Sequence, residues 1–257
     1  MVRISLYLDH HQLILEQGMC DLFAMSCNSE DHAKESLTIL ANEHSQNNPD
    51  GWGIAYYDND KAIVKKAPEK AKTSQTFFSA VEKAKSNIIV AHVRYATTGD
   101  RCEENCHPFK GKLFEREWIF AHNGTIRNIP HHQASAGQTD SEQIFRLILD
   151  QIETYQRNGK IHGIFSGIQQ GIKTAFDICG KENTLNFLLS DGTILYAFNH
   201  YKDKPIYYLK RQKPYGGAFL ISTQILSNNE SWKTIRPDSL LMVCNGEILE
   251  LSDPIIK

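Results

Sequence analysis

The alternation of hydrophobic and polar residues along the chain predicts many short strands. Single apolar segments that are typical of strands occupy residues 20–26 (CDLFAMS), 87–96 (NIIVAHVRYA) and 117–124 (EWIFAHNG). Paired apolar segments flank turn-forming residues such as Asp191-Gly192 and Asn245-Gly246, which favour tight hairpins. These hairpins are predicted over residues 51–66, 185–199 and 240–251.

Four stretches have the period of amphipathic helices. The clearest is residues 139–156, where one side carries Ile144, Phe145, Ile148 and Ile152. A second helix is expected to begin at a Ser29 or Asp31 cap and run to about Glu43, and two more cover residues 74–85 and 164–179. Helices and hairpins stand in separate blocks, so the sequence predicts an α+β fold with packed sheets and not a doubly wound sheet.

Composition narrows the class of protein. The chain has 257 residues, 41% of them apolar and 23% charged, and a net charge of −2, so neither nucleic acid nor an anionic membrane is an expected partner. No apolar run approaches the roughly 20 residues of a membrane span. Six sparse cysteines indicate a reducing compartment, and Asp9, His10 and His11 interrupt the only candidate signal peptide. We therefore expect a cytoplasmic protein.

Four polar clusters follow apolar strands, where scaffolds commonly display functional groups. They are NPDGWG (48–53), HVRYATTG (92–99), AHNG (121–124) and TDSE (139–142). Each also has a purely structural explanation. Asn-Gly favours a turn, TDSE is a helix-capping pattern, and Arg94 would suit a surface ion pair.

Together with Cys20, these clusters resemble the class-II glutamine amidotransferases of the N-terminal-nucleophile hydrolase superfamily, and most closely their small stand-alone YafJ-type branch. The resemblance runs from Met19 to about Pro237 through MCDLFAMS, DGWGIAYY, AHVRYATTG, ENCHPF, WIFAHNG, TDSE, FLLSDG and NESWKTIRP, in the family's order. It implies a four-layer αββα sandwich of two mainly antiparallel sheets and one amidotransferase domain over residues 20–257.

In this family the nucleophile is an N-terminal cysteine, here Cys20, and the base is its own α-amino group. A free thiol with a pKa near 8.5 is only a few per cent thiolate at neutrality, whereas an α-amine with a pKa of about 7.7–8.0 can accept its proton. That amine exists only if Cys20 is the first residue of the mature chain. Residues 1–19 are then either a mis-called start, with translation beginning at Met19, or a propeptide.

The resemblance also assigns the groups that hold the substrate. Asn123 through its side-chain N–H and Gly124 through its backbone N–H would bind the tetrahedral oxyanion. Gly124 is expected because a Cβ would crowd the approaching substrate. Arg94 would fork onto the α-carboxylate of glutamine, and Asp140 would accept hydrogen bonds from its α-ammonium group.

Further residues are expected around this pocket. Thr97, Trp52 and Gly53 would line it, although DGWG differs from the Asp-Ser pattern of the sugar-forming amidotransferases. His107, in CHPF, is expected to support the pocket from behind. His92 alternates with Arg94 along its strand and so shares a face with it, either as a structural histidine or as a catalytic one.

The segment RCEENCH (101–107) raises the question of a zinc site. Cys102, Cys106 and His107 are potential ligands, but no second pair follows at the spacing of a structural site, which normally has four ligands. We therefore expect neither a metal nor another cofactor.

The expected reaction is the glutaminase half-reaction, in which L-glutamine gives glutamate and ammonia through a cysteinyl thioester. The ammonia would pass to a partner synthetase. Two alternatives remain open on these motifs. Arg94 and Asp140 would hold the same glutamyl group in another γ-glutamyl amide or peptide, and a catalytically silent subunit could sense glutamine without cleaving it.

Overall fold

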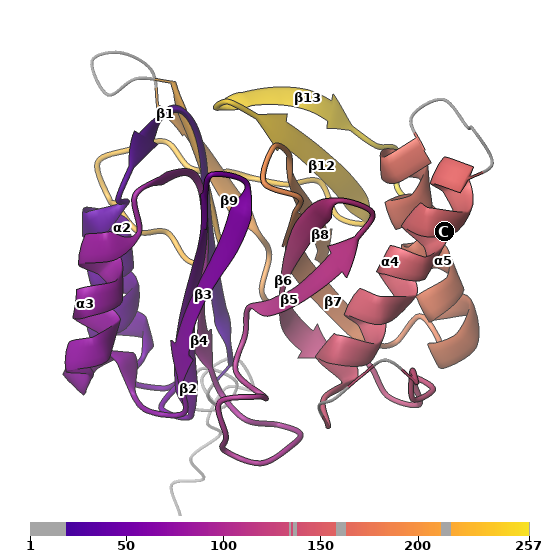
Figure 1. Cartoon of the computed structure of the whole chain (residues 1–257), viewed down its shortest axis with the longest axis horizontal. Helices are drawn as coiled ribbons and strands as arrows, with labels where there is room; N and C mark the ends of the chain where they lie inside the picture. Colours follow the sequence, from indigo (N-terminus) through magenta and orange to yellow (C-terminus); the bar gives the residue numbers. More distant parts are fainter. Residues whose placement is uncertain (1–18, 134, 136–137, 158–162, 212–216, 257) are drawn as a thin grey trace, which may run out of the picture.

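The computed structural model describes residues 19–133, 135, 138–157, 163–211 and 217–256. The predicted upstream extension lies outside these ranges except for Met19. Two antiparallel sheets pack face to face, with helices on their outer faces (Figure 1). This arrangement confirms the α+β class and the four-layer αββα order.

The first sheet has seven strands in the order β11-β9-β10-β1-β4-β2-β3. Its strands are β1 (Asp21–Asp31), β2 (Gly51–Asp58), β3 (Lys61–Ala67), β4 (Ser86–Arg94), β9 (Tyr207–Arg211), β10 (Ala218–Ser222) and β11 (Lys233–Thr234). Strand β1 lies at its centre, between β10 and β4, and so the residue that precedes β1 is held at the middle of one sheet edge.

The second sheet has six strands in the order β13-β12-β8-β7-β6-β5. Its strands are β5 (Phe109–Leu113), β6 (Arg116–Thr125), β7 (Thr184–Ser190), β8 (Leu195–His200), β12 (Ser239–Cys244) and β13 (Glu247–Leu251). The outer helical layers are α2 (Lys34–Ile39), the π-helical turn η1 (Leu40–His44), the 3₁₀ turn η2 (Ala71–Thr73) and α3 (Gln75–Lys83) on the first sheet, and α4 (Asp140–Arg157) and α5 (Gly163–Cys179) on the second.

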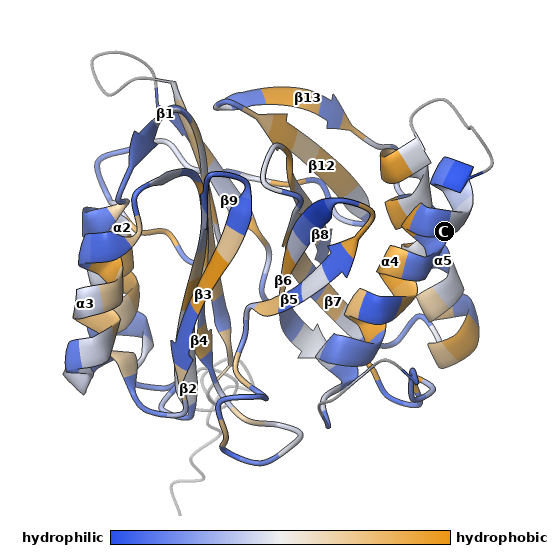
Figure 2. Ribbon diagram, viewed as in Figure 1, coloured by the Kyte–Doolittle hydropathy of each residue, from blue (hydrophilic) through white to orange (hydrophobic). Residues whose placement is uncertain are grey.

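Strand alternation distributes the apolar residues among three buried layers. On β1, Phe23 and Met25 face the α2–α3 layer, whereas Leu22 and Ala24 face the second sheet. The apolar stripe predicted on residues 139–156 packs against the second sheet, as the inward orange faces of α4 and α5 in Figure 2 show. Each fully buried large side chain contributes roughly 1.5–3 kcal/mol, so these layers supply most of the driving force for folding.

The predicted hairpins form, and their turns show why. Asn59 and Asp60 have φ of +47° and +65°, and Asn245 and Gly246 have φ of +50° and +79°. Two successive positive φ values match the right-handed twist of the flanking strands. In the hairpin over residues 185–199, Asp191 Oδ1 accepts hydrogen bonds from backbone N–H groups of the turn.

The predicted start of the first helix is wrong. Strand β1 continues to Asp31, whose Cα pairs with that of Ser86, so the residues expected to cap a helix belong to a strand. Asp31 Oδ1 then accepts the backbone N–H of Ala33 at 2.9 Å, which turns the chain. Helix α2 begins only at Lys34, after Ala33 with φ of +48° and without a side-chain cap.

Candidate active site

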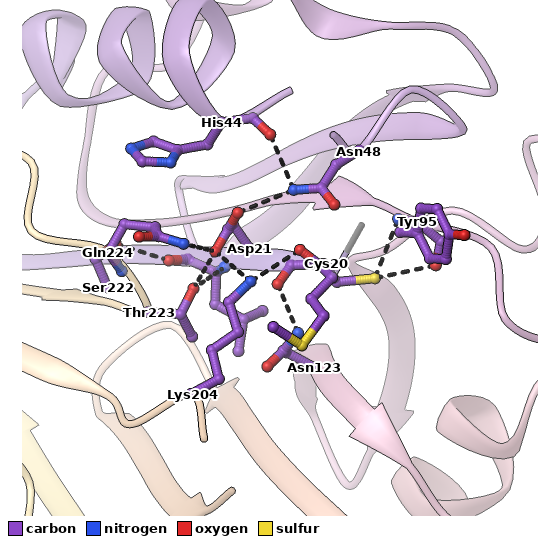
Figure 3. Close-up of polar contacts among 12 residues, drawn as sticks. Cys20, Asp21, His44, Asn48, Tyr95, Asn123, Lys204, Ser222, Thr223 and Gln224 are labelled. Atoms are coloured by element: carbon purple, nitrogen blue, oxygen red, sulfur yellow. Dashed lines mark hydrogen bonds and ion pairs between the residues drawn. The ribbon is translucent and has the colours of Figure 1, made fainter. Parts of the chain in front are cut away.

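Cys20 lies at the edge of the first sheet, immediately before β1. Its Sγ lies 3.2 Å from the backbone nitrogen and 3.3 Å from the backbone oxygen of Tyr95, the residue that follows β4 (Figure 3). Strands β1 and β4 are antiparallel neighbours, with Asp21 opposite Val93, and this register brings the two chain segments together. The Tyr95 N–H is therefore a fixed donor to the sulfur.

A small cavity opens beside this sulfur. It has a volume of about 20 Å³, and its lining residues are Cys20, Arg94, Tyr95, Thr97, Thr98, His107, His122, Gly124, Thr139, Asp140 and Ser141. Such a volume accommodates about one water molecule. Cys20 thus meets residues of three of the four predicted polar clusters, HVRYATTG, AHNG and TDSE, whereas NPDGWG contributes no lining residue.

Arg94 is 4% exposed and points toward the cavity from the end of β4. Its guanidinium donates to the backbone oxygens of Thr98 at 2.8 Å and Asp100 at 3.1 Å. A guanidinium has five N–H donors, so these bonds leave donors for a carboxylate. These hydrogen bonds also hold residues 98–100 over the guanidinium and so help to close the cavity.

Asp140 is the first residue of α4 and also lines the cavity. Its Oδ2 accepts the N–H of Ile126 at 2.7 Å and its Oδ1 accepts the N–H of Ser141 at 2.9 Å. Thr139 Oγ1 accepts the N–H of Glu142 at 3.4 Å. The TDSE segment therefore caps the helix and presents a carboxylate to the cavity at once.

Asn123 and Gly124 end strand β6 opposite Cys20. The side-chain Nδ2 of Asn123 donates to the backbone oxygen of Cys20 at 2.5 Å. Gly124 has φ of +145°, and a Cβ added there would lie 2.2 Å from the backbone oxygen of Thr184 on β7. The structure thus gives a different reason for glycine from the predicted one: the neighbouring strand excludes a side chain.

The three residues expected to line the pocket have different surroundings. Thr97 lines the cavity. Gly53 is not among the lining residues, contrary to the prediction, but it packs against one of them, since a Cβ there would lie 2.0 Å from the backbone oxygen of His107. Trp52 is not among the lining residues, which corrects its predicted role. Its ring is 2% exposed and packs edge-on against Phe77 of α3, 5.2 Å between centroids, because successive residues of β2 point to opposite faces.

Three histidines are buried at the cavity: His107 and His122 line it, and His92 lies next to His107. His107 Nδ1 and His92 Nε2 are 3.2 Å apart, and His122 Nδ1 lies 2.9 Å from Ser141 Oγ. Burial lowers the pKa of all three, well below the usual value for His92 and His107, so they are neutral at pH 7. As predicted, His92 and Arg94 are two residues apart on β4 and therefore share a face of the strand. The ring of His92 contacts the ring of His107.

The Cys20 thiol is protonated at neutral pH. Burial of the sulfur raises its pKa to about 11, although the Tyr95 N–H and the charge of Lys204 lower it. Among the described residues, no histidine hydrogen-bonds to the sulfur; its partners are the N–H and carbonyl of Tyr95. Attack by this thiol therefore requires another base nearby.

Sequence reasoning missed an ion pair directly beneath Cys20. Lys204, between β8 and β9, lies 2.8 Å from Asp21 Oδ1, and both side chains are buried (Figure 3). Lys204 belongs to none of the polar clusters, and Asp21 could only be suspected from its place beside Cys20. Asp50 of NPDGWG was also missed, and its Oδ2 accepts the N–H of Ala96 at 2.8 Å and so braces the segment after β4.

The RCEENCH cysteines do not converge on a common point. Cys106 Sγ contacts the backbone oxygens of Ala67 at 3.5 Å and Cys102 at 3.4 Å, and the ring of His107 is directed to His92. Within the described ranges, no group of three or more His, Cys, Asp or Glu side chains is arranged to hold a metal. In the same part of the chain, no helix is long and apolar enough to cross a membrane.

Comparison with known proteins defines the class to which this fold and site belong. The family profile of class-II glutamine amidotransferases matches residues 19–220, and the chain belongs to that family. Glutamine phosphoribosylpyrophosphate amidotransferase from B. subtilis has the same fold in about half of its chain, with a TM-score of 0.65 at 16% identity over 91% of this chain and 49% of that one.

Two relatives match over most of their length, and a third matches over a shorter segment. YafJ of Escherichia coli, provisionally named a glutamine amidotransferase, is 30% identical over 89% of this chain and 99% of its own. A predicted glutamine amidotransferase from Pseudomonas aeruginosa has a TM-score of 0.64 at 22% identity, over 90% of this chain and 100% of its own. The γ-glutamyl-hercynylcysteine sulfoxide hydrolase of Mycobacterium tuberculosis is 30% identical over 36% of this chain and 38% of its own.

Proposed function

We propose that the mature protein hydrolyses the side-chain amide of L-glutamine, with Cys20 as nucleophile and the α-amino group of Cys20 as base. The observation that carries this proposal is the convergence of Cys20, Arg94 and Asp140 on one cavity. A thiol, a guanidinium and a carboxylate are the groups needed to attack a glutamyl amide and to hold both charged ends of its amino acid.

In the proposed reaction the α-amine takes the thiol proton while the sulfur bonds to the amide carbon. The carbonyl oxygen becomes an oxyanion, which accepts hydrogen bonds from Asn123 Nδ2 and the Gly124 N–H. Proton return to the amide nitrogen releases ammonia and leaves a thioester. Water, deprotonated by the same amine, then attacks the thioester to give glutamate and regenerate the thiol.

The raised pKa of the Cys20 thiol supports this assignment of the base. With a pKa of about 11, the sulfur has essentially no thiolate at pH 7 and depends on a proton acceptor. The α-amine is close by construction, since it belongs to the same residue, and its ordinary pKa of about 7.7–8.0 suits the transfer.

The proposed base requires that Cys20 be the first residue of the working chain. In the structure a peptide bond joins it to Met19, so its nitrogen is an amide without basicity. The family profile begins at residue 19, which supports translation from Met19 followed by removal of that methionine. Processing of residues 1–19 as a propeptide would produce the same amine.

Binding of glutamine requires an opening of the site. A cavity of about 20 Å³ holds about one water, far less than an amino acid, and the carbonyls of Thr98 and Asp100 cover Arg94. We propose that the segment 95–100 withdraws from Arg94 as glutamine enters, and that the α-carboxylate of the substrate replaces these carbonyls as the partner of the guanidinium.

A second candidate is hydrolysis of a γ-glutamyl amide other than glutamine. The similarity to a γ-glutamyl-hercynylcysteine sulfoxide hydrolase, although it covers only 36% of this chain, favours that alternative. Arg94 and Asp140 would hold the glutamyl group in either case. Family members often pair with synthetase domains, and we propose a cytoplasmic partner of that kind as the recipient of ammonia if glutamine is the substrate.

The test compares three forms of the protein: one that begins at Cys20, one that retains residues 1–19, and C20A in the shorter form. Ammonia and glutamate from L-glutamine are measured beside free amine from γ-glutamyl peptides. We expect turnover only in the form with a free Cys20 amine, and covalent labelling of Cys20 there by 6-diazo-5-oxo-norleucine. Full activity of C20A, or of protein still joined to Met19, would overturn the proposal. Tight glutamine binding without turnover would indicate a sensing subunit instead.

A further inference from the structure

The ion pair beneath Cys20 is buried and firmly held. Asp21 is 2% exposed and Lys204 6% exposed, and Nζ lies 2.8 Å from Asp21 Oδ1 (Figure 3). Lysine is almost never buried to this extent unless it is paired. A buried pair of this kind is weak evidence of stabilisation, because desolvation opposes the attraction of the two charges. Its position next to the nucleophile suggests another purpose.

The remaining acceptor sites of Asp21 are filled by neutral donors. Asn48 Nδ2 donates to Oδ2 at 2.9 Å, while Thr223 Oγ1 and Gln224 Nε2 donate to Oδ1 at 2.8 and 2.9 Å. These donors come from two separate chain segments, one before β2 and one after β10, so the carboxylate has a fixed position and much of its charge is satisfied by hydrogen bonds.

Lys204 is fixed at its backbone too, and it has one further contact. Asn186 Nδ2 on β7 donates to the Lys204 backbone oxygen at 2.6 Å. Lys204 Nζ donates to the backbone oxygen of Met19 at 2.8 Å. One C=O bond of about 1.2 Å and one C–N bond of about 1.3 Å separate that oxygen from the nitrogen of Cys20. The ammonium therefore lies within roughly 5.4 Å of the Cys20 nitrogen.

Removal of Met19 takes away this carbonyl acceptor and turns the adjacent amide into an amine. A free α-amine with its ordinary pKa of about 7.7–8.0 would be mostly protonated at pH 7 and unable to accept a proton. A neighbouring ammonium opposes that protonation, because two like charges close together in a buried site repel each other. Lys204 is thus placed to favour the basic form of the amine.

We propose that Lys204, held in place by Asp21, is a positioning residue that keeps the freed α-amino group of Cys20 in its unprotonated, proton-accepting form near neutral pH. This inference rests on the proposed function, in which that amine is the base. Lys204, between β8 and β9, thereby becomes part of the candidate active site, and the Asp21–Lys204 pair acts on catalysis through the amine.

Other charged and titratable groups surround Cys20. The signs of their charges decide whether they favour the protonated or the unprotonated form of its amine. The groups around Cys20 and its ion pair include Asp21, His44, Arg94, His107, His122, Asp140, Tyr201 and Lys204. The two cations, Lys204 and Arg94, favour an unprotonated amine, and Asp21 and Asp140 oppose it. At the neighbouring thiol, after burial and the Tyr95 hydrogen bond, Lys204 affects the pKa more than Asp21 does.

The experiment uses the full-length mature protein beginning at Cys20, labelled with ¹⁵N-cysteine. The α-amine then has a ¹⁵N resonance distinct from the five cysteine amides, and its titration is followed directly by NMR. The variants are K204M, K204R and the charge-free double variant D21N/K204M. The matched control is K210M, which removes a lysine from a more exposed ion pair with Glu247 of the second sheet. The pH dependence of kcat/KM for glutamine is measured alongside.

In K204M we expect the amine midpoint to rise by about one pH unit, and the acid limb of kcat/KM to move up with it. K204R should stay within about 0.3 units of the wild type, and K210M should be unchanged. If K204M does not fold, the double variant replaces it and its midpoint should also rise. A K204M or double variant whose amine titrates as in the wild type would overturn the inference. Absence of glutamine turnover in the wild type would instead count against the proposed function, while the NMR titration still tests Lys204.

Discussion

Asn123 Nδ2 donates to the backbone oxygen of Cys20 at 2.5 Å, and this contact joins the two sheets at the candidate site. Asn123 belongs to β6 of the second sheet, whereas Cys20 precedes β1 at the centre of the first. The other amide atom, Asn123 Oδ1, is buried and has no hydrogen-bond partner among the described residues. A buried acceptor left unpaired is costly, so an amide in this setting has capacity for a further ligand.

Replacement of Asn123 by alanine should abolish most of the activity without unfolding the protein. Loss of one oxyanion donor lowers kcat by about 10²–10³-fold. The matched control is N87A, because Asn87 Nδ2 also donates to a cysteine backbone oxygen, that of Cys27, at 3.0 Å, although this contact lies within the first sheet. Both variants should lose similar stability in urea unfolding, but only N123A should lose turnover. Equal kcat values in the two variants would exclude Asn123 from the oxyanion site.

Substitution of Arg94 by lysine should weaken substrate binding although the charge is retained. A lysine cannot offer the planar fork that a carboxylate binds with two hydrogen bonds. Loss of one charge-assisted bond lowers kcat/KM by roughly 10–100-fold, and most of the change should be in KM. R157K, on an exposed pair with Glu153 in α4, should leave both constants unchanged. A wild-type KM in R94K would contradict carboxylate binding by this residue.

Gly124 should tolerate no side chain, for a reason that lies in the fold. With φ of +145° and the Thr184 oxygen 2.2 Å from the point that a Cβ would occupy, G124A must separate β6 from β7. We expect a loss of at least about 2–4 kcal/mol in the free energy of unfolding. G163A is the control, since its Cβ would have no contact closer than 3.3 Å, to the side chain of Gln156. Equal stability of the two variants in denaturant would refute the steric argument.

The hairpins were predictable because their turn residues determine local geometry. Asn-Gly at 245–246 adopts two positive φ values, as that residue pair favours in a tight turn. The start of α2 was not predictable, since Ser29 and Asp31 suit both a helix cap and the end of a strand. Pairing of Asp31 with Ser86, far along the chain, decides the outcome. Tertiary pairing therefore overrides a local capping preference.

In the candidate site too, some residues are predictable from local motifs and others depend on tertiary contacts. The motifs of Cys20, Arg94 and Asp140 lie at strand ends or begin a helix, and these three residues line one cavity. The resemblance of DGWG to the family predicts Trp52 in the pocket, but the alternation of side chains along β2 directs its ring to the opposite face, against Phe77. Lys204 was missed because a lone lysine in a turn carries no local signal. Only the three-dimensional contact with Asp21 reveals it.

Acidification should destabilise the protein at a pH where carboxylates are still ionised. Burial lowers the pKa of both histidines well below its usual value near 6.5, and the positive charge of Arg94 acts in the same direction on each. As the pH falls below 6.5, the unfolded chain binds protons that the native state does not. Each such histidine then removes up to about 1.4 kcal/mol of stability per pH unit, and above about pH 7.5 the contribution is constant.

Urea unfolding at pH 8, 7, 6 and 5.5 measures this dependence. The variant H107N retains a polar partner for His92 Nε2 but has no imidazole to protonate. Its free energy of unfolding should therefore fall less steeply than that of the wild type below pH 6.5. At pH 8 its free energy of unfolding should be lower than that of the wild type. H131Q replaces an exposed histidine and should keep the steep wild-type dependence. If the free energy of unfolding of H107N falls with pH as steeply as that of the wild type, protonation of His107 does not contribute to the loss of stability in acid.

The thiol of Cys20 should be a poor nucleophile toward simple alkylating agents in the form that retains Met19. With a pKa of about 11, its thiolate fraction at pH 8 is about 10⁻³, compared with about a quarter for an ordinary thiol. Iodoacetamide labelling, followed by peptide mapping, should be slow at Cys20 and rise about ten-fold per pH unit up to about pH 11. Half-buried Cys102 serves as the internal reference. A labelling rate that levels off at pH 8–9 would mean that the sulfur is not desolvated, and the argument that it needs a proton acceptor would lose its support.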